Sequence, residues 1–239
     1  MAVHILICTG TSVALLVAAA AVFLSIYYPA DEEAQAVLSD TSGAAVSVID
    51  GGYMLDGKGS DTALIFYPGA KVQTEAYLPI LKRIADGGID CFLLEAPMRL
   101  AILDTGAADK VTSHYSYDTW LVSGHSMGGI AAADYASKHS DIIDAVVLLA
   151  AYPNKKLPDS LSLYTIYGSE DIVLDLDAYK QAKENAPSVY REFVITGGNH
   201  AQFGNYGEQS GDGKATISRD EQQAQTTDII LDLFLPAAS

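Results

Sequence analysis

The stretch GHSMG at residues 124–128 decides how the rest of this chain is interpreted. The apolar stretch 119–122 before it is typical of a strand, and the alanine-rich stretch 129–136 after it is typical of a helix. A strand, a Gly-x-Ser-x-Gly turn and a helix in this order predict a nucleophile elbow, which holds the serine hydroxyl out from the end of the strand. Glycine two positions before and after Ser126 removes side chains that would collide in so tight a turn. The pattern therefore predicts a nucleophilic serine.

Apolar runs alternate with helix-like stretches along the rest of the chain. Strands are expected at 46–49, 53–55, 63–67, 90–94, 120–123, 145–149, 163–167 and 192–195. Helices are expected at 32–38, 74–86, 104–114, 130–140, 176–185 and 220–234. This alternation predicts an α/β protein with a mostly parallel sheet that helices cover on both faces. In such sheets, chemistry gathers at the carboxyl ends of the strands.

Composition and charge narrow the classes of function. The chain has 14 basic and 30 acidic residues, a formal net charge of −16, so nucleic acid is not an expected partner. Its two cysteines are Cys8, in an N-terminal apolar run, and Cys91, in an expected strand. No Cys or His cluster has metal-ligand spacing, so we expect neither a metal nor a cofactor, and we interpret Cys91 as a core residue. The oligomeric state is left open.

The first 30 residues differ from the rest. Residues 5–28 carry no charged side chain and end in two tyrosines. About 20 apolar residues span a bilayer as a helix, and tyrosines suit its interface. A cleaved signal peptide is the alternative, but its apolar core would be shorter and a basic residue would precede it. We therefore expect a transmembrane anchor in residues 1–30 and an extracytoplasmic domain in residues 31–239, or a secreted domain if the segment is cleaved.

A serine hydroxyl needs a base to take its proton. The chain offers His4, His114, His125, His139 and His200. His200 follows the expected strand 192–195, which places it at a carboxyl end of the sheet, after both the serine and a candidate acid. The other four lie in the apolar segment, next to the serine, or on expected helices. We therefore select His200.

The base in turn needs a carboxylate to orient it, and the reaction needs donors for an oxyanion. The expected strand 163–167 runs into GSED at residues 168–171, where we favour Asp171 over its neighbour Glu170. One oxyanion donor is expected to be the amide of Met127, directly after the nucleophile. The second is expected to be the amide of Ala70, in the loop after the strand 63–67.

At these residues the sequence resembles the α/β-hydrolase superfamily, and more narrowly its small, lid-poor branch related to dienelactone hydrolase. The matching segments are FYPGAKV at 66–72, GHSMGG at 124–129, GSED at 168–171 and GNHAQFG at 198–204. The resemblance implies Ser126 as nucleophile, His200 as base and Asp171 as orienting acid. Dienelactone hydrolases carry a cysteine as nucleophile where this chain has serine, which favours esters over lactones.

The connection between the expected strands 145–149 and 163–167 is too short for a large cap, so we expect an open cleft. Met98 and Tyr206 are candidate residues of its walls, although for each of them a core or surface position is the favoured alternative. These features together predict a serine hydrolase that cleaves a small carboxylic ester or thioester through an acyl-enzyme. Two alternatives remain: an acyltransferase that passes the same acyl group to another acceptor, and a surface binding module without catalysis.

Overall fold

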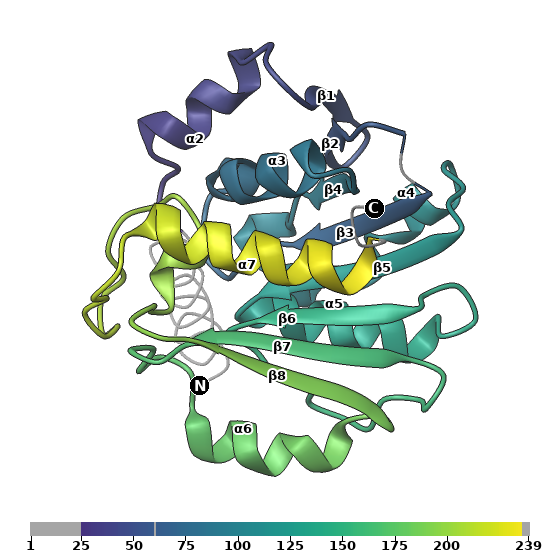
Figure 1. The fold of residues 1–239 in the computed structure, drawn as a ribbon, viewed down its shortest axis with the longest axis vertical. Coiled ribbons are helices and arrows are strands. Elements are labelled where there is room, and N and C mark those ends of the chain that lie inside the picture. Colours follow the sequence, from purple (N-terminus) through teal and green to yellow (C-terminus); the bar gives the residue numbers. More distant parts are fainter. Residues whose placement is uncertain (1–24, 60, 236–239) are drawn as a thin grey trace, which may run out of the picture.

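The computed structural model describes residues 25–59 and 61–235, which form an eight-stranded sheet between helices (Figure 1). The strands are β1 (Ala45–Ile49), β2 (Gly52–Asp56), β3 (Thr62–Tyr67), β4 (Asp90–Leu94), β5 (Thr119–His125), β6 (Ala145–Leu149), β7 (Ser162–Gly168) and β8 (Val189–Ile195). The α-helices are α2 (Glu32–Ala36), α3 (Leu78–Asp86), α4 (Asp109–Thr112), α5 (Met127–Lys138), α6 (Leu176–Ala182) and α7 (Arg219–Phe234). Short 3-10 helices are η1 (Val37–Ser39), η2 (Thr74–Tyr77), η3 (Pro97–Arg99), η4 (Ala101–Leu103), η5 (Lys183–Asn185) and η6 (Ala201–Phe203).

The predicted α/β class and mostly parallel sheet are confirmed. The strand order is β1-β2-β4-β3-β5-β6-β7-β8. The six strands β3 to β8 all run parallel to one another. The β1–β2 hairpin is antiparallel, and its β2 pairs antiparallel with β4 at one edge of these six strands. The carboxyl ends of the six parallel strands therefore share one edge of the sheet, which we call the carboxyl edge.

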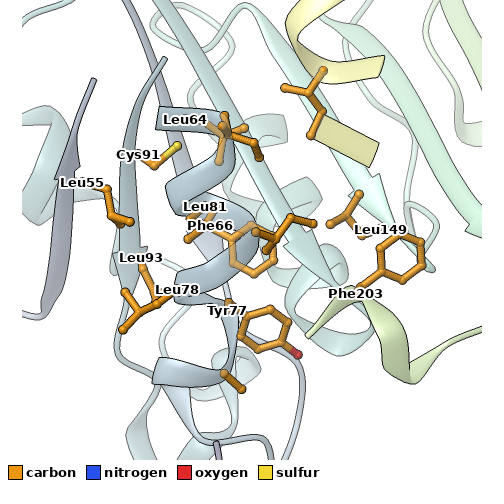
Figure 2. Close-up of a cluster of buried hydrophobic side chains, with 14 of the residues drawn as sticks. Leu55, Leu64, Phe66, Tyr77, Leu78, Leu81, Cys91, Leu93, Leu149 and Phe203 are labelled. Carbon is orange, nitrogen blue, oxygen red and sulfur yellow. The ribbon is translucent and has the colours of Figure 1, made fainter. Parts of the chain in front are cut away.

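Apolar side chains cover both faces of the sheet. On one face, residues such as Leu64, Phe66 and Leu149 pack against α3 and α7, and Figure 2 shows this cluster with Tyr77 and Phe203 at its side. On the other face, residues such as Val122 and Val146 pack against the alanine-rich α5. The central strand β3 is buried along its whole length. Burial on both faces explains why β3 is a continuous apolar run in the sequence.

The chain enters the sheet beside the carboxyl end of β3. The amide of Tyr28 donates to the carbonyl of Lys71 at 2.7 Å, and the amide of Gln73 donates to the carbonyl of Tyr28 at 2.9 Å. The predicted transmembrane span covers residues 5–28; residues 5–24 of it lie outside the described residues, and residues 26–28 are not helical. Across residues 25–59 and 61–235, none of the helices has both the length and the apolar character to cross a bilayer.

One predicted helix is much shorter than expected. The stretch 104–114 contains only α4 as α-helix, because a tertiary contact holds the residues before it in turns. The Tyr67 hydroxyl donates to the carbonyl of Thr105 at 2.7 Å and accepts from the amide of Ala108 at 3.2 Å. Conversely, the helix expected from residue 130 already begins at Met127.

Candidate active site

Ser126 occupies the sharp turn between β5 and α5. Its backbone has φ 54° and ψ −123°, a conformation that L-residues seldom adopt. A Cβ on Gly124 would lie 2.5 Å from the carbonyl carbon of Gly128, and one on Gly128 would lie 2.2 Å from the carbonyl oxygen of Tyr67. Both positions therefore require glycine. The second contact also brings the loop after β3 against the start of α5.

Strained backbone is concentrated at the carboxyl edge. Among the described residues, the non-glycine positions with positive φ are Lys71, Met98, Arg99, Ser126 and Ala150. Lys71 follows β3, Met98 and Arg99 follow β4, Ser126 follows β5 and Ala150 follows β6. Such conformations cost about 1–3 kcal/mol each and cluster at functional sites. The strained residues therefore indicate a functional site at the carboxyl edge, where the candidate catalytic side chains also lie.

Asp171 and His200 form a buried pair. His200 Nδ1 donates to Asp171 Oδ2 at 2.8 Å, and the two residues are 2% and 3% exposed. The second carboxylate oxygen of Asp171 accepts from the amides of Val173 and Leu174 at 2.9 and 2.8 Å. Because Nδ1 carries the proton of neutral His200, Nε2 is a bare acceptor. That nitrogen is buried and has no hydrogen-bond partner in the described part of the chain.

The loops that carry this pair are held together by a close backbone contact. A Cβ on Gly168 would lie 2.2 Å from the carbonyl group of Gly198. Just beyond, the amide of Glu170 donates to the carbonyl of Gly198 at 2.8 Å. The Glu170 carboxylate itself accepts from the Ser169 hydroxyl at 2.9 Å rather than from His200. The imidazole therefore faces Asp171.

Ser126 and His200 line one cleft of about 220 Å³. Its remaining walls are largely apolar and come from Met127, Ile130, Ala150, Tyr152, Val173, Leu174 and Asp175. The chain between β6 and β7 contains no helix, so the cleft lacks a cap there, as expected. A larger hollow of about 540 Å³ lies beside residues 199–215, but neither Ser126 nor His200 lines it. The smaller cleft is the candidate site because it holds both reactive groups.

A buried chain of hydrogen bonds connects the two sides of the cleft. The amide of Gly69 donates to the Tyr77 hydroxyl at 3.1 Å, and that hydroxyl lies 2.8 Å from His125 Nδ1. His125 Nε2 lies 3.1 Å from the carbonyl oxygen of His200. Burial lowers the pKa of His125 well below its ordinary value, so the ring is neutral. A carbonyl can only accept, so Nε2 carries the proton and Nδ1 accepts from Tyr77.

This series of hydrogen bonds was not expected from the sequence. The sequence sets His125 aside as the neighbour of the serine, and Tyr77 falls within the helix expected at 74–86. The structure shows that His125 is 1% exposed and Tyr77 is fully buried. Burial also raises the pKa of Tyr77, which keeps its hydroxyl protonated and able to donate. No local sequence signal reveals such a contact between residues 48 positions apart.

The remaining sequence candidates lie at several places. Met127 is the first residue of α5, so its amide is one of those without a partner inside the helix. Ala70 lies in the partly exposed loop after β3. Tyr206 is not a wall residue: it is 5% exposed and its ring packs near those of Tyr28 and Tyr77. Met98 is 60% exposed and lines a separate hollow of about 380 Å³.

His114, His139 and Cys91 do not line the cleft. His114 is exposed at the end of α4, and His139 lies 3.5 Å from Asp109. Cys91 is fully buried, which confirms it as a core residue, and burial raises the pKa of its thiol. Within residues 25–59 and 61–235, no group of three His, Cys, Asp or Glu side chains could hold a metal ion.

Comparisons with known proteins agree with this fold. The family described as "Alpha/beta hydrolase family" matches residues 63–224. Comparison of the sequence with curated proteins gives no match. Among solved structures, dienelactone hydrolase from Anabaena variabilis superposes with a TM-score of 0.58 at 17% identity, covering 80% of this chain and 95% of that one.

Two further structures show the same fold. A thermophilic esterase from Thermogutta terrifontis has a TM-score of 0.54 at 16% identity and covers 81% of this chain and 92% of its own. Alpha/beta hydrolase domain-containing protein 10 from mouse has a TM-score of 0.52 at 12% identity and covers 80% and 100%. At these identities the similarity is one of fold.

Proposed function

We propose that this chain, which belongs to the alpha/beta hydrolase family, is a serine hydrolase that cleaves a carboxylic ester or thioester through an acyl-enzyme. One observation carries the proposal. His200, whose Nδ1 bonds to Asp171 and whose Nε2 has no hydrogen-bond partner, lines the same cleft as a serine held in a strained turn. A nucleophile, a base and an orienting acid in this arrangement are the requirements of acyl transfer.

In the first half-reaction, Ser126 Oγ attacks the carbonyl carbon while His200 Nε2 takes the hydroxyl proton. The serine–histidine hydrogen bond has to form as substrate binds, since Nε2 is unpaired without it. The oxyanion is held by the amides of Met127 and Ala70. The carbon–oxygen or carbon–sulfur bond then breaks, and the leaving group takes the proton from Nε2.

In the second half-reaction, water attacks the acyl-enzyme and gives its proton to Nε2. The bond between Ser126 Oγ and the acyl carbon breaks, the serine regains the proton, and the free acid leaves. The Asp171 carboxylate accepts three hydrogen bonds, from His200, Val173 and Leu174, and orients the imidazole in both half-reactions. These bonds also stabilise the imidazolium that forms between the two proton transfers.

The cleft favours a short, uncharged acyl group. Its volume of about 220 Å³ is small, and Ile130, Ala150 and Val173 present apolar surface beside the serine. Asp175 lies in the same wall and would repel an acyl group that carries a carboxylate.

Covalent labelling of the full chain with a fluorophosphonate probe, followed by peptide mapping, tests the proposal. We expect label on Ser126, none in Ser126→Ala, and strongly slowed labelling in His200→Ala. Ser160→Ala is the matched control, because Ser160 is an exposed serine just before β7, at the edge of the sheet opposite the carboxyl edge, and it should label normally. Label that persists in Ser126→Ala would overturn the assignment.

A further inference from the structure

The exposed large hydrophobic side chains are not spread evenly over the surface. Of the thirteen found among the described residues, eight lie at the carboxyl edge. One group contains Ile26, Tyr27, Met98, Ile102 and Leu103, which are 38–62% exposed. A second group contains Ile172, Val173 and Leu176, which are 37–70% exposed. We call the two groups together the apolar rim. Scattered apolar side chains are ordinary, whereas grouped ones indicate an interaction surface.

The two groups lie on opposite sides of the catalytic cleft. The first group follows β4 and is joined to the loop after β3, because the amide of Lys71 donates to the carbonyl of Arg99 at 2.8 Å. The second group follows β7, and its Val173 lines the cleft together with Ser126. In the order β4-β3-β5-β6-β7, the serine at the end of β5 lies between them. A flat apolar body that covered both groups would therefore also cover the cleft mouth.

The chain itself indicates what that body is. Residues 5–24 carry no charge, and about 20 apolar residues are enough to span a bilayer. This stretch joins the domain through Ile26 and Tyr27, within the first group of the rim. The Arg99 guanidinium lies 3.7 Å from the centre of the Tyr27 ring. Tyrosine and arginine side chains of this kind suit the boundary between headgroups and acyl chains.

Charge does not supply the attraction. The net charge of −16 disfavours binding to an anionic surface by electrostatics, so contact would depend on the apolar rim and on the tether. A tether that enters at the rim keeps this face close to the bilayer, so that even weak apolar contacts are made at high effective concentration.

We propose that the apolar rim rests in the interface of a lipid bilayer, with residues 5–24 as the anchor, and that the cleft opens onto the membrane. The second part of this proposal rests on the proposed hydrolase function. The substrate is an ester carried in the bilayer, and it reaches Ser126 without crossing bulk water. The absence of a cap between β6 and β7 fits this arrangement, because the membrane itself then covers the cleft.

Fluorescence quenching tests the docking surface without reference to activity. The full chain with Cys8→Ala is reconstituted in phosphatidylcholine vesicles and labelled at a single introduced cysteine; Cys91 is fully buried and stays unlabelled. The rim positions are Met98→Cys and Ile172→Cys. Val48→Cys on β1 is the matched control, at 80% exposure outside the rim. We expect lipids with a doxyl group near the headgroup to quench both rim positions several-fold more than position 48. Equal quenching at all three positions would overturn the proposal.

Paired substrates test the second step. In the double variant Leu103→Asn, Ile172→Asn, both replacements are neutral, so the charge beside Asp171 does not change. We expect hydrolysis of a vesicle-borne ester to fall on the order of tenfold, while hydrolysis of a water-soluble short ester is unchanged. If the double variant and the wild-type chain hydrolysed the vesicle-borne ester at equal rates, the proposal of a bilayer-borne substrate would be overturned. Failure of the wild-type chain to cleave either ester would overturn the hydrolase function, and the quenching result would still decide the docking surface.

Discussion

The two sides of the cleft are built differently. On the β7–β8 side, backbone meets backbone: Gly168 lies against Gly198, and this contact carries the Asp171–His200 pair. On the β3–β5 side, the elbow is also closed by glycine, but buried side chains add a second support through Gly69, Tyr77 and His125. The bond from His125 to the carbonyl oxygen of His200 connects the two sides.

This difference predicts which substitutions disrupt each side of the cleft. A backbone contact fails when any side-chain atom is added, because carbonyl groups cannot move aside without moving their strands. A chain of side-chain hydrogen bonds fails when one atom is removed, because its buried neighbours lose their partners. The position of His200 depends on both supports.

The largest effect is expected from the acid. In Asp171→Asn, the amide oxygen can still accept from the amides of Val173 and Leu174, but its NH₂ group then faces His200 Nδ1. The imidazole would carry its proton on Nε2 and could not accept the serine proton, so kcat should fall about 1,000- to 10,000-fold. Steady-state kinetics on a soluble ester measures this.

Glu170→Gln is the matched control for that variant, since the two residues are adjacent and Glu170 bonds to Ser169. Its kcat should stay within a few-fold of wild type. A greater loss in Glu170→Gln than in Asp171→Asn would exchange the roles of the two residues.

The next effect concerns the backbone contact on the β7–β8 side. Gly168→Ala places a Cβ 2.2 Å from the carbonyl of Gly198 and should lower the free energy of unfolding by about 1–3 kcal/mol. The loop that carries His200 should shift as well, so kcat should fall. In Gly106→Ala the new Cβ has its nearest atom at 3.8 Å, so the change should be within about 0.5 kcal/mol. Urea unfolding of both variants checks the difference, and equal midpoints would count against the contact.

The support on the β3–β5 side is tested by removing one oxygen. Tyr77→Phe leaves the amide of Gly69 and Nδ1 of His125 without their partner in a fully buried place. We expect the free energy of unfolding to fall by about 1–3 kcal/mol, with a smaller loss of kcat than in Gly168→Ala. Tyr206→Phe is the control, because that hydroxyl bonds to the partly exposed Gln209 and its loss should cost less. If both variants lost the same free energy of unfolding, the hydrogen bonds of the Tyr77 hydroxyl would contribute no special support.

Much of this site could be predicted from the sequence because its signals are local. A strand, a glycine-flanked serine and a helix are contiguous, and the strand ends that carry Asp171 and His200 follow apolar runs with clear limits. The α/β class and the mostly parallel sheet followed from the alternation of strands and helices, whereas the strand order was not predicted. The roles of Ser126, Asp171, His200, Met127 and Ala70 in catalysis stay predictions.

The parts that could not be predicted depend on contacts between distant segments. Tyr77 and His125 are 48 positions apart, and nothing in either neighbourhood distinguishes a buried relay from ordinary core residues. For Tyr206 the sequence left a wall position and a core position open, and only its contact with Tyr28, which enters from the start of the domain, places it in the core. The first turn of the helix expected at 104–114 does not form, because the hydroxyl of Tyr67 bonds to the carbonyl of Thr105, again a contact between distant segments.

The smallest effect is expected from pH, and it isolates the residue that joins the two sides. Burial holds the pKa of His125 well below 6.5, so the folded chain keeps this ring neutral where the unfolded chain binds a proton. The unfolded state therefore gains stability as the pH falls below about 6.5, and the free energy of unfolding should drop by up to about 1.4 kcal/mol per pH unit between pH 6.5 and 5. Urea unfolding across that range measures the slope. In His125→Asn the slope should be shallower by this amount, although the variant is less stable overall, whereas His114→Asn, at an exposed site, should keep the wild-type slope. If His125→Asn retained the full slope, another group would have to carry the proton, and His125 would not be the neutral link between Tyr77 and the His200 loop.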